Sequence, residues 1–236
     1  MKIAFFTGPA ETAGYFLRDI MAHLALRHEI KVYPVIDKEA VCAQLEWADI
    51  AWVEWADMHA ALVSRMPKRC PVVLRLHSYE AFATKVLTRI KWSGIDKIIF
   101  VSPAIKNIFF SNFHALDVKN EVVFNAINID TFTLKKSFER TYKIANVTIS
   151  MNPEKNIPFV LQCFHAMAQK EKRLSLHMTG TPYPDSVVHQ RTQVYLHHMI
   201  KELKLEGRVF FAGRIPPERM NDWLEDKDML LSGSFF

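Results

Sequence analysis

The sequence predicts an α/β protein built from two consecutive doubly wound units, each a parallel β-sheet with helices on its faces. Short apolar runs alternate with longer amphipathic stretches along the chain, which is the pattern of buried parallel strands and their covering helices. Hydrophobic residues make up 50% of the 236 positions and charged residues 23%, which is typical of a folded protein rather than a disordered one. The alternation is interrupted after residue 125, which divides the chain in two.

The first unit, residues 1–125, alternates strands with helices often enough to make one complete doubly wound domain. In its first helix Phe16, Ile20 and Leu24 recur four positions apart, so one face is apolar. Ser102 is a good N-cap, and the proline behind it has the fixed φ that suits a first helical turn. Strands are expected at residues 2–6, 30–35, 49–53, 72–76, 97–101 and 121–124, and helices at residues 15–28, 38–46, 58–66, 79–92 and 103–113.

Residues 126–142 lack this alternation and contain a charged stretch, so we expect them to connect the two units. The second unit, residues 143–236, ends on an apolar strand followed by Phe235 and Phe236, whereas most domain termini are polar. We therefore expect this unit to be incomplete and the chain to be a fragment of a longer protein. Strands are expected at residues 143–149, 174–179, 208–212 and 229–232, and helices at residues 157–169, 187–203 and 217–224.

Composition restricts the classes of partner and the compartment. The formal net charge of +5 and the isoelectric point near 9.0 indicate an anionic partner. Basic residues are scattered among acidic ones without a block of roughly five or six, which argues against nucleic acid. The three cysteines are widely spaced among apolar residues, as expected for free thiols in a reducing compartment. No apolar run approaches the ~20 residues of a membrane-spanning helix, and the apolar start is too short for a signal peptide. The sequence thus predicts a cytoplasmic protein.

Ligands of open parallel sheets bind beyond the carboxyl ends of the strands, which selects His77 and its neighbours. His77 directly follows the strand at residues 72–76, with Ser78 and Glu80 beside it. An imidazole in that place is a candidate catalytic group because its charge changes near neutral pH; a structural histidine is the alternative. Ser78, Glu80 and Asn125, which follows the last strand of the first unit, are candidates for acceptor binding or for lining the cleft.

Two positions are candidates for holding phosphate. Gly14 begins the first helix, where a phosphate or sugar would approach the backbone amides; a tight-turn glycine is the alternative. Its loop contains neither G-x-G-x-x-G nor a Walker sequence, so neither a dinucleotide site nor a P-loop is expected. Lys155 lies at the start of another helix, where a lysine is unfavourable for the helix itself. It becomes favourable when an anion such as a diphosphate occupies that end; a merely solvated lysine is the alternative.

The remaining histidines have no such setting. His197 and His198 are adjacent on a helix and cannot face one ligand together. No cluster of His, Cys and Asp has the spacing of metal ligands, so we expect no bound metal.

Several segments resemble the retaining glycosyltransferases of family 4, whose GT-B fold consists of two facing Rossmann-like domains. Residues 123–132 are similar to the family's hxNGVDxxxF segment, in which Asn125 matches. Residues 144–155 resemble hhxVGRLxxxKG, which places Lys155 on the lysine that contacts the donor diphosphate. Ser150 stands where the family has its partnering arginine, and the glycine after the lysine is an asparagine here.

Other segments extend the resemblance over almost the whole chain. Residues 205–213 resemble LxxxVxFxG, and in the family the loop that follows, here Gly213 and Arg214, lies near the nucleotide base. His77 matches the histidine that family members place beside the transferred sugar, and Gly14 matches part of a Gly-Gly turn near the phosphates. The last residues resemble the segment just before the family's Glu-x7-Glu motif, whose acids hold the donor sugar, so the resemblance implies that this chain alone binds nucleotide weakly and transfers no sugar.

The resemblance implies a glycosyltransferase that moves a sugar, with retention, from a UDP- or GDP-type donor to a glycan or lipid-linked acceptor in polysaccharide or glycoconjugate synthesis. It implies no metal or other cofactor, because lysines, arginines and helix N-termini stabilise the departing diphosphate. Relatives with lipid-linked acceptors imply contact with the anionic inner face of a membrane. The helix at residues 79–92 suits such a surface, because it carries Lys85, Arg89 and Lys91 beside Phe82, Val86 and Trp92; an ordinary helix with a solvated basic edge is the alternative.

Two other classes of protein are alternatives. Ser150 and the missing acids favour a glycosyltransferase-like subunit that binds a partner and transfers no sugar, unless another cation such as Arg214 rebuilds the donor site. An NAD-dependent oxidoreductase shares the fold class, but the chain lacks the dinucleotide fingerprint.

Overall fold

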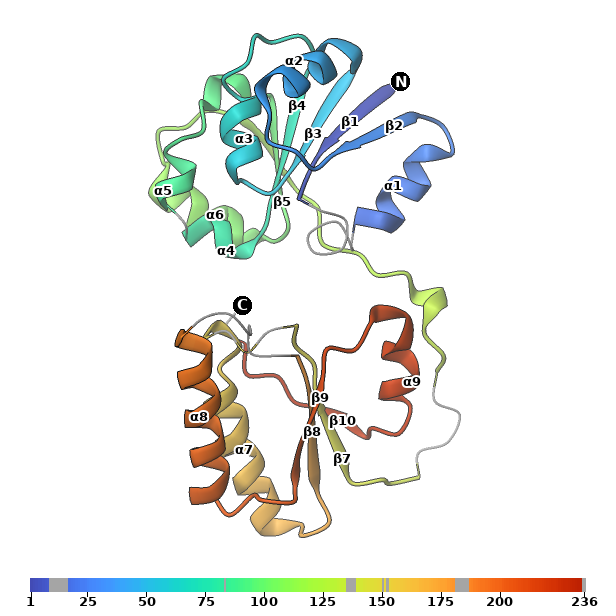
Figure 1. Cartoon of the computed structure of the whole chain (residues 1–236), viewed down its shortest axis with the longest axis vertical. Helices are drawn as coiled ribbons and strands as arrows, with labels where there is room; N and C mark the ends of the chain where they lie inside the picture. The colour runs from blue at the N-terminus through green and yellow to red at the C-terminus, as the bar shows by residue number, and fades with distance from the viewer. Residues whose placement is uncertain are drawn as a thin grey trace. The chain divides into compact units, whose positions relative to one another are not determined.

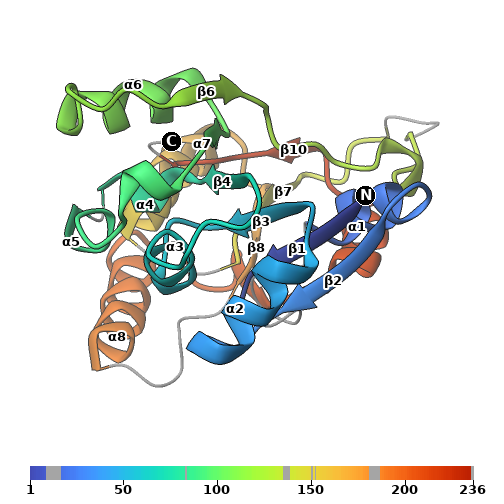
Figure 2. The same ribbon diagram turned by 90° about the horizontal axis from the view of Figure 1, so that it is seen from above.

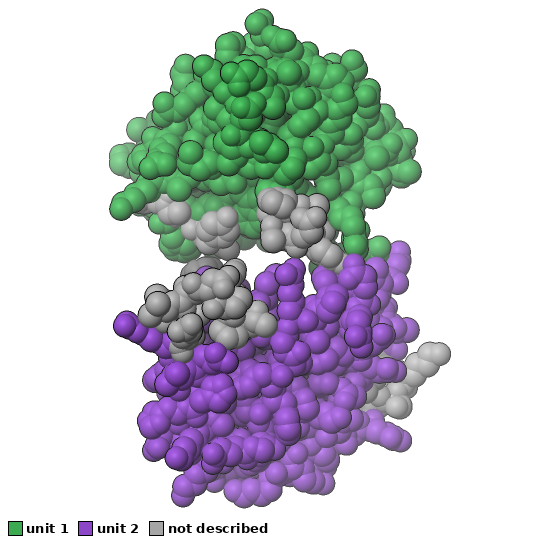
Figure 3. Space-filling model, in the orientation of Figure 1, with its two compact units in different colours: residues 1–128 green, residues 129–236 purple. Residues whose placement is uncertain are grey.

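The computed structural model describes residues 1–8, 17–82, 84–134, 139–149, 151, 153–180 and 187–234; the side chains of residues 78, 79, 84 and 187–190 lie outside this description. The chain divides into two compact units, Met1–Asn128 and Ile129–Phe236 (Figure 3). Each unit has its own parallel sheet (Figure 1). The predicted α/β class, with two doubly wound units, is therefore confirmed.

The sheet of unit 1 has the strand order β2-β1-β3-β4-β5-β6, and its neighbouring strands are parallel. The order reverses at β1, which has β2 on one side and β3 on the other. In such sheets the ligand crevice lies at the carboxyl ends of the strands beside the reversal. The strands are β1 (Lys2–Phe6), β2 (Glu29–Tyr33), β3 (Ile50–Glu54), β4 (Val72–Leu76), β5 (Lys97–Phe100) and β6 (Lys119–Val122).

Helices cover both faces of this sheet (Figures 1 and 2). Phe5 and Phe6 point to opposite faces, as neighbours in a strand do. Phe5 packs under Leu17 of α1, whereas Phe6 belongs to the larger core that includes Leu74 and Phe109. The helical segments are α1 (Leu17–Ala25), α2 (Lys38–Trp47), α3 (Met58–Val63), α4 (Ser78–Phe82), α5 (Thr84–Leu87), the 3-10 turn η1 (Trp92–Gly94) and α6 (Pro103–Asn112).

The helix expected at residues 79–92 extends too far, because α5 ends at Leu87 and the 3-10 turn η1 begins at Trp92. Tertiary contacts bend this segment. The Arg65 guanidinium donates to the Arg89 carbonyl at 2.8 Å. Gly94 passes so close to α3 that a Cβ on it would lie 2.1 Å from the Ser64 carbonyl oxygen. These contacts override the local helical pattern. The other elements lie within a few residues of their expected positions.

The sheet of unit 2 has the order β10-β7-β8-β9 and is also parallel. Its order reverses at β7, so the expected crevice lies at the carboxyl ends of β7 and β10. α7 and α8 cover one face and α9 lies on the other (Figure 1). The core under α7 and α8 includes Ile144, Phe164, Leu176 and Leu196. The elements are η2 (Ile129–Thr131), β7 (Lys143–Asn146), η3 (Pro153–Lys155), α7 (Ile157–Lys170), β8 (Ser175–Thr179), α8 (Val187–Glu202), β9 (Val209–Gly213), η4 (Pro217–Arg219), α9 (Met220–Leu224) and β10 (Met229–Leu230).

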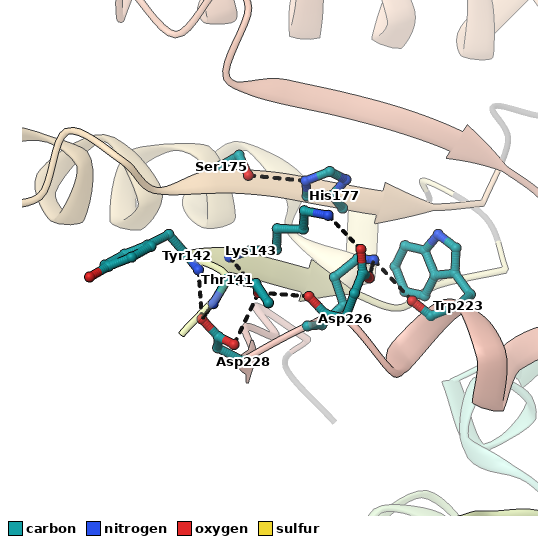
Figure 4. A network of polar contacts seen from close by, with 9 residues as sticks. Thr141, Tyr142, Lys143, Ser175, His177, Trp223, Asp226 and Asp228 are labelled. Atoms are coloured by element: carbon teal, nitrogen blue, oxygen red, sulfur yellow. Dashed lines mark hydrogen bonds and ion pairs between the residues drawn. The ribbon is translucent and has the colours of Figure 1, made fainter. Parts of the chain in front are cut away.

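A polar network joins the segment that enters unit 2 to the turn before β10 (Figure 4). The Asp228 carboxylate accepts the Thr141 N–H at 2.8 Å. The Asp226 carboxylate lies 2.5 Å from Lys143 Nζ at the start of β7, and it also bonds the Lys227 ammonium. Partial burial opposes the ionisation of Asp226, but these hydrogen bonds outweigh it and lower the pKa of the carboxyl to about 2. The network fixes the edge of the sheet opposite the expected crevice.

Candidate functional site

The carboxyl edge of unit 1 carries a buried polar cluster centred on Glu54. Glu54 ends β3 and lies beside Arg75 of β4, because the two residues are in register. Its carboxylate accepts from Trp52 Nε1 at 2.7 Å and from Arg75 Nη1 at 3.1 Å. It also lies 2.6 Å from His77 Nε2. The Glu54 side chain is fully buried, where an isolated charge would be strongly disfavoured, and these contacts satisfy it.

His77, the predicted catalytic residue, directly follows β4 and is 5% exposed. Its ring stacks on the Trp55 indole with 4.0 Å between centroids. Trp55 has a φ of 76°, in the left-handed region that bulky side chains rarely adopt. The imidazole is therefore held between a buried carboxylate and an aromatic ring.

Glu80 joins the two loops that leave β3 and β4. It lies on α4, and its side chain is buried. Its carboxyl group accepts the His77 N–H at 2.5 Å and also accepts the Ala56 N–H. Burial raises the pKa of this carboxyl to about 8, although the two hydrogen bonds oppose the shift. Glu80 is consequently mostly protonated at neutral pH.

Asn125 belongs to the same cluster, because its Oδ1 accepts a hydrogen bond from Arg75 Nη2. His77 and Asn125 are therefore linked through Glu54 and Arg75, which the prediction did not include, whereas Glu80 contacts His77 directly. Ser78 begins α4, but its side chain lies outside the described residues, and Gly14 lies outside them altogether.

Sequence reasoning missed Glu54 and Arg75, together with the indole rings around them. A signal for both was present, because each is a charged residue inside an otherwise apolar run. Strands of a parallel sheet are covered on both faces, so a charge inside one is expected to be paired.

A cavity of about 280 Å³ lies at the carboxyl edge of unit 2. Gly180 follows β8 and Gly213 ends β9, and the Gly180 N–H donates to the Gly213 carbonyl at 2.8 Å. Their φ values are 91° and 71°, which glycine adopts without strain. A Cβ on Gly180 would also lie 2.8 Å from the Thr148 carbonyl oxygen. The residues that line the cavity are Met151, Gly180, Gln193, Leu196, His197, Phe211 and Gly213.

α8 supplies one wall of this cavity, and His197 is part of it. The sequence gives His197 no setting at a site, so the structure corrects that expectation: His197 lines the cavity without His198. Its Nδ1 lies 2.8 Å from the Gln193 carbonyl oxygen, and its ring centroid lies 6.0 Å from that of Phe211. The volume is near the lower end of the ~300–1,000 Å³ typical of small-molecule sites, which suits one ring system with aromatic and amide groups around it.

Lys155 lies in η3, directly before the 14-residue helix α7. Among the described residues, none forms an ion pair or hydrogen bond with its half-buried ammonium. The N-cap, Asn156, has a φ of 48° and makes no side-chain cap hydrogen bond. Asparagine tolerates this left-handed conformation, which explains how it replaces the glycine of the resembling motif. A Cβ on Gly233 would lie 3.0 Å from the Asn156 carbonyl oxygen, so the segment after β10 passes close to this helix N-terminus.

The remaining predicted positions are only partly placed. Of the residues predicted to hold the donor, Gly213 lines the cavity, whereas Lys155 and Arg214 do not. Arg214 is exposed and directly follows Gly213. Ser150 lies outside the described residues. Within the described part of the chain, no group of three or more His, Cys, Asp or Glu residues is arranged to hold a metal ion. No described helix is long and apolar enough to cross a membrane.

Comparisons with known proteins identify the fold. No family model and no characterised protein matches the chain in sequence. The structure of HepE from Anabaena, solved with UDP and glucose, matches with a TM-score of 0.72 and 17% identity over 99% of this chain and 74% of HepE. Sucrose-phosphate synthase from Thermosynechococcus elongatus matches with a TM-score of 0.72 and 13% identity, over 100% of this chain and 76% of the synthase. A trehalose-6-phosphate synthase matches with a TM-score of 0.72 and 9% identity, over 99% of this chain and 78% of the synthase. The chain thus has the fold of GT-B glycosyltransferases, as predicted.

Proposed function

We propose that the protein is a glycosyltransferase that moves a sugar, with retention, from a UDP- or GDP-type donor to a glycan or lipid-linked acceptor in polysaccharide or glycoconjugate synthesis. The carboxyl edge of unit 2 carries this proposal. There, in the loop between β7 and α7, Met151 lines a cavity and Lys155 lies at a helix N-terminus. The fold that the chain shares with HepE, whose structure contains UDP and glucose, supports it.

Two parts of the donor, its nucleobase and its diphosphate, fit two features of this edge, the cavity and the N-terminus of α7. A nucleobase fits the cavity, where Phe211 and His197 offer rings for stacking. The diphosphate fits the N-terminus of α7, where the helix dipole favours an anion. Lys155 and Arg214 are the proposed cations that stabilise the charge of the leaving diphosphate. We propose no metal in this chemistry, so transfer is expected to persist in the presence of a chelator.

The proposed acceptor side is the carboxyl edge of unit 1. His77 is the proposed catalytic residue, and Glu80 and Asn125 hold the loops around it. Gly14 and Ser78 stay proposed contacts of the donor phosphate and the acceptor, respectively.

We also propose that the protein is cytoplasmic and binds the anionic inner face of a membrane through α4, α5 and η1. Lys85, Arg89 and Lys91 are exposed, and Phe82 is 48% exposed beside them. Trp92 packs instead on Phe109, at 5.2 Å between ring centroids, so it is not part of this surface. Sedimentation with anionic liposomes is expected at low salt and is expected to weaken at high salt. No sedimentation at low salt would contradict the membrane proposal.

The activity is tested by release of free nucleoside diphosphate from UDP- and GDP-sugars by the full-length protein, with and without candidate glycan acceptors. Acceptor-dependent release from one donor class, with the anomeric configuration retained in the product, is the expected result. Nucleotide binding without release from any donor would favour a binding subunit instead. Failure to bind either nucleotide would contradict both functions.

A further inference from the structure

The buried cluster in unit 1 is more polar than stability alone explains. Glu54, Arg75, His77 and Glu80 are all ionisable, and none is more than 5% exposed. Replacing buried ion pairs with apolar side chains of similar volume is often neutral or stabilising. The cluster therefore indicates a role that apolar packing would not provide.

Two carboxyl groups from different elements hold His77 at two points. Glu54 of β3 contacts its Nε2, and Glu80 of α4 accepts its main-chain N–H. Trp55 fixes the plane of the ring from a strained backbone conformation. Such strain persists where the surrounding structure over-determines a residue, and it is concentrated at functional sites. His77 is thus oriented in advance of any ligand.

The donors around Glu54 decide which nitrogen of His77 carries a proton. The Trp52 indole and the Arg75 guanidinium can only donate hydrogen bonds, so the Glu54 carboxylate is the acceptor in both contacts. The Arg75 guanidinium also compensates the negative charge on the oxygen that His77 approaches. A carboxylate in this setting accepts from Nε2 as well, which fixes the Nε2–H form of the ring.

We propose that Glu54 is a positioning residue that keeps a proton on His77 Nε2 and so makes Nδ1 the edge through which His77 acts on the sugar or its acceptor. The part that concerns sugar rests on the proposed function, whereas the assignment of the proton does not. Among the described residues, the charged and titratable groups around His77 include Glu54 from β3, which contacts its ring, Arg75 from β4, which pairs with Glu54, and Glu80 from α4, which accepts its main-chain N–H.

The proton assignment is tested by nitrogen-15 NMR of the full chain labelled at histidine. The expected result is a slowly exchanging Nε2–H resonance that disappears in His77→Gln. In Glu54→Gln it is expected to move upfield, because a neutral amide accepts a weaker hydrogen bond than a carboxylate. Glu121→Gln, which removes an exposed carboxylate paired with Lys97, is the matched control and leaves the resonance unchanged. A wild-type imidazole protonated on Nδ1 alone would overturn the assignment, whether or not the variants fold.

The functional part is tested by kinetics on the same variants. Glu54→Gln is expected to lower kcat by roughly 10- to 100-fold, by analogy with the outer partners that orient metal-binding histidines. The KM for the donor is expected to stay within about twofold, and Glu54→Asp to recover part of kcat, because ground-state donor binding does not use this edge. An unchanged kcat, or equal changes in kcat and KM, would overturn the positioning role. If the full-length wild type transfers no sugar, the proposed function fails, and the NMR result still decides the proton assignment.

Discussion

The carboxyl edges of the two sheets differ in how their polar groups are satisfied. In unit 1 the charged side chains bind one another, and Glu54 alone has three donors within 3.1 Å. In unit 2 the corresponding edge has a cavity, and Lys155 has no partner among the described residues. The same rule of strand ends selects both edges, so the difference lies in the side chains placed there.

This difference distinguishes His77, which is oriented without a ligand, from Lys155, which gains a partner only when a ligand binds. Residues that already satisfy one another keep an orientation in the absence of ligand, which suits His77. A lysine at a helix N-terminus that lacks a described partner gains its partner when an anion binds, which suits a donor diphosphate. Variants in unit 1 should therefore change stability, whereas variants of Lys155 should change binding.

The largest expected effect is that of Arg75→Met. It leaves the Glu54 carboxylate buried without its cation, and breaking a buried pair in this way lowers the free energy of unfolding by about 3–5 kcal/mol. The double variant Glu54→Gln/Arg75→Met should recover most of the loss, because no unpaired charge remains. Lys155→Met is the matched change in unit 2 and should stay within about 0.5 kcal/mol of the wild type. Denaturant unfolding measures all three, and equal stabilities of Arg75→Met and Lys155→Met would remove the contrast between the edges.

The next effect concerns the wall of the cavity. Gly180→Ala combines a positive φ with a Cβ only 2.8 Å from a backbone oxygen, so we expect a loss of about 2–4 kcal/mol in unfolding free energy together with weaker nucleotide binding. Gly207→Ala is the control, because Gly207 has a similar φ of 72° and no atom within 4 Å of the added Cβ. That variant should lose only the ~1–2 kcal/mol of the left-handed conformation. A Gly180→Ala protein as stable as Gly207→Ala would show that the backbone at Thr148 moves away from the added Cβ at little cost in stability.

A third effect is the loss of stability of unit 1 as pH rises from the unfolded to the folded pKa of Glu80. Its carboxyl has a pKa of about 8 in the folded state and about 4.3 in the unfolded chain. The folded state therefore holds the proton more tightly, and its contribution is fully present below the unfolded pKa and is lost as pH rises through 8. Unfolding free energy should fall by up to about 1.4 kcal/mol per pH unit in this window. Glu80→Gln should remove the slope, and a slope that persists in this variant would assign it to another group.

The smallest effect is the acid dependence of unit 2 on Asp226, whose folded pKa is about 2. The unfolded value is about 3.9, so the stabilisation is present above that value and is lost as pH falls through 2. The Asp226 side chain is 47% exposed, so solvent screening limits the effect to less than about 1 kcal/mol. Asp226→Asn should narrow the difference in unfolding free energy between pH 5 and pH 2 by that amount. An identical difference in the variant would mean that the network in Figure 4 contributes nothing to acid stability.

The sequence predicts the strands well because apolar runs bounded by polar residues are a local signal. β1 and β4 begin and end where the runs do. The end of the helix expected at residues 79–92 is wrong for the opposite reason, since the contact of Gly94 with Ser64 involves residues far apart in the chain. Local periodicity contains no information on such an approach.

The site is predictable to the extent that it follows from strand ends. That rule selects His77 and Glu80, and it selects Lys155 and Gly213 in unit 2. It does not select Glu54 or Arg75, because their pairing depends on the register of β3 and β4, nor His197, whose place depends on the packing of α8. Residues that surround a candidate site are thus harder to predict from the sequence than residues at the strand ends.

Titration calorimetry of UDP and GDP with the wild type, Lys155→Ala and Lys201→Ala tests the central claim most directly. Lys201 is an exposed lysine in the last turn of α8 and is the matched control. One nucleotide is expected to bind the wild type and Lys201→Ala alike. It should bind Lys155→Ala about 1.5–3 kcal/mol more weakly, the contribution of a hydrogen bond to a charged group. Equal affinities for all three proteins would contradict a diphosphate site at the N-terminus of α7.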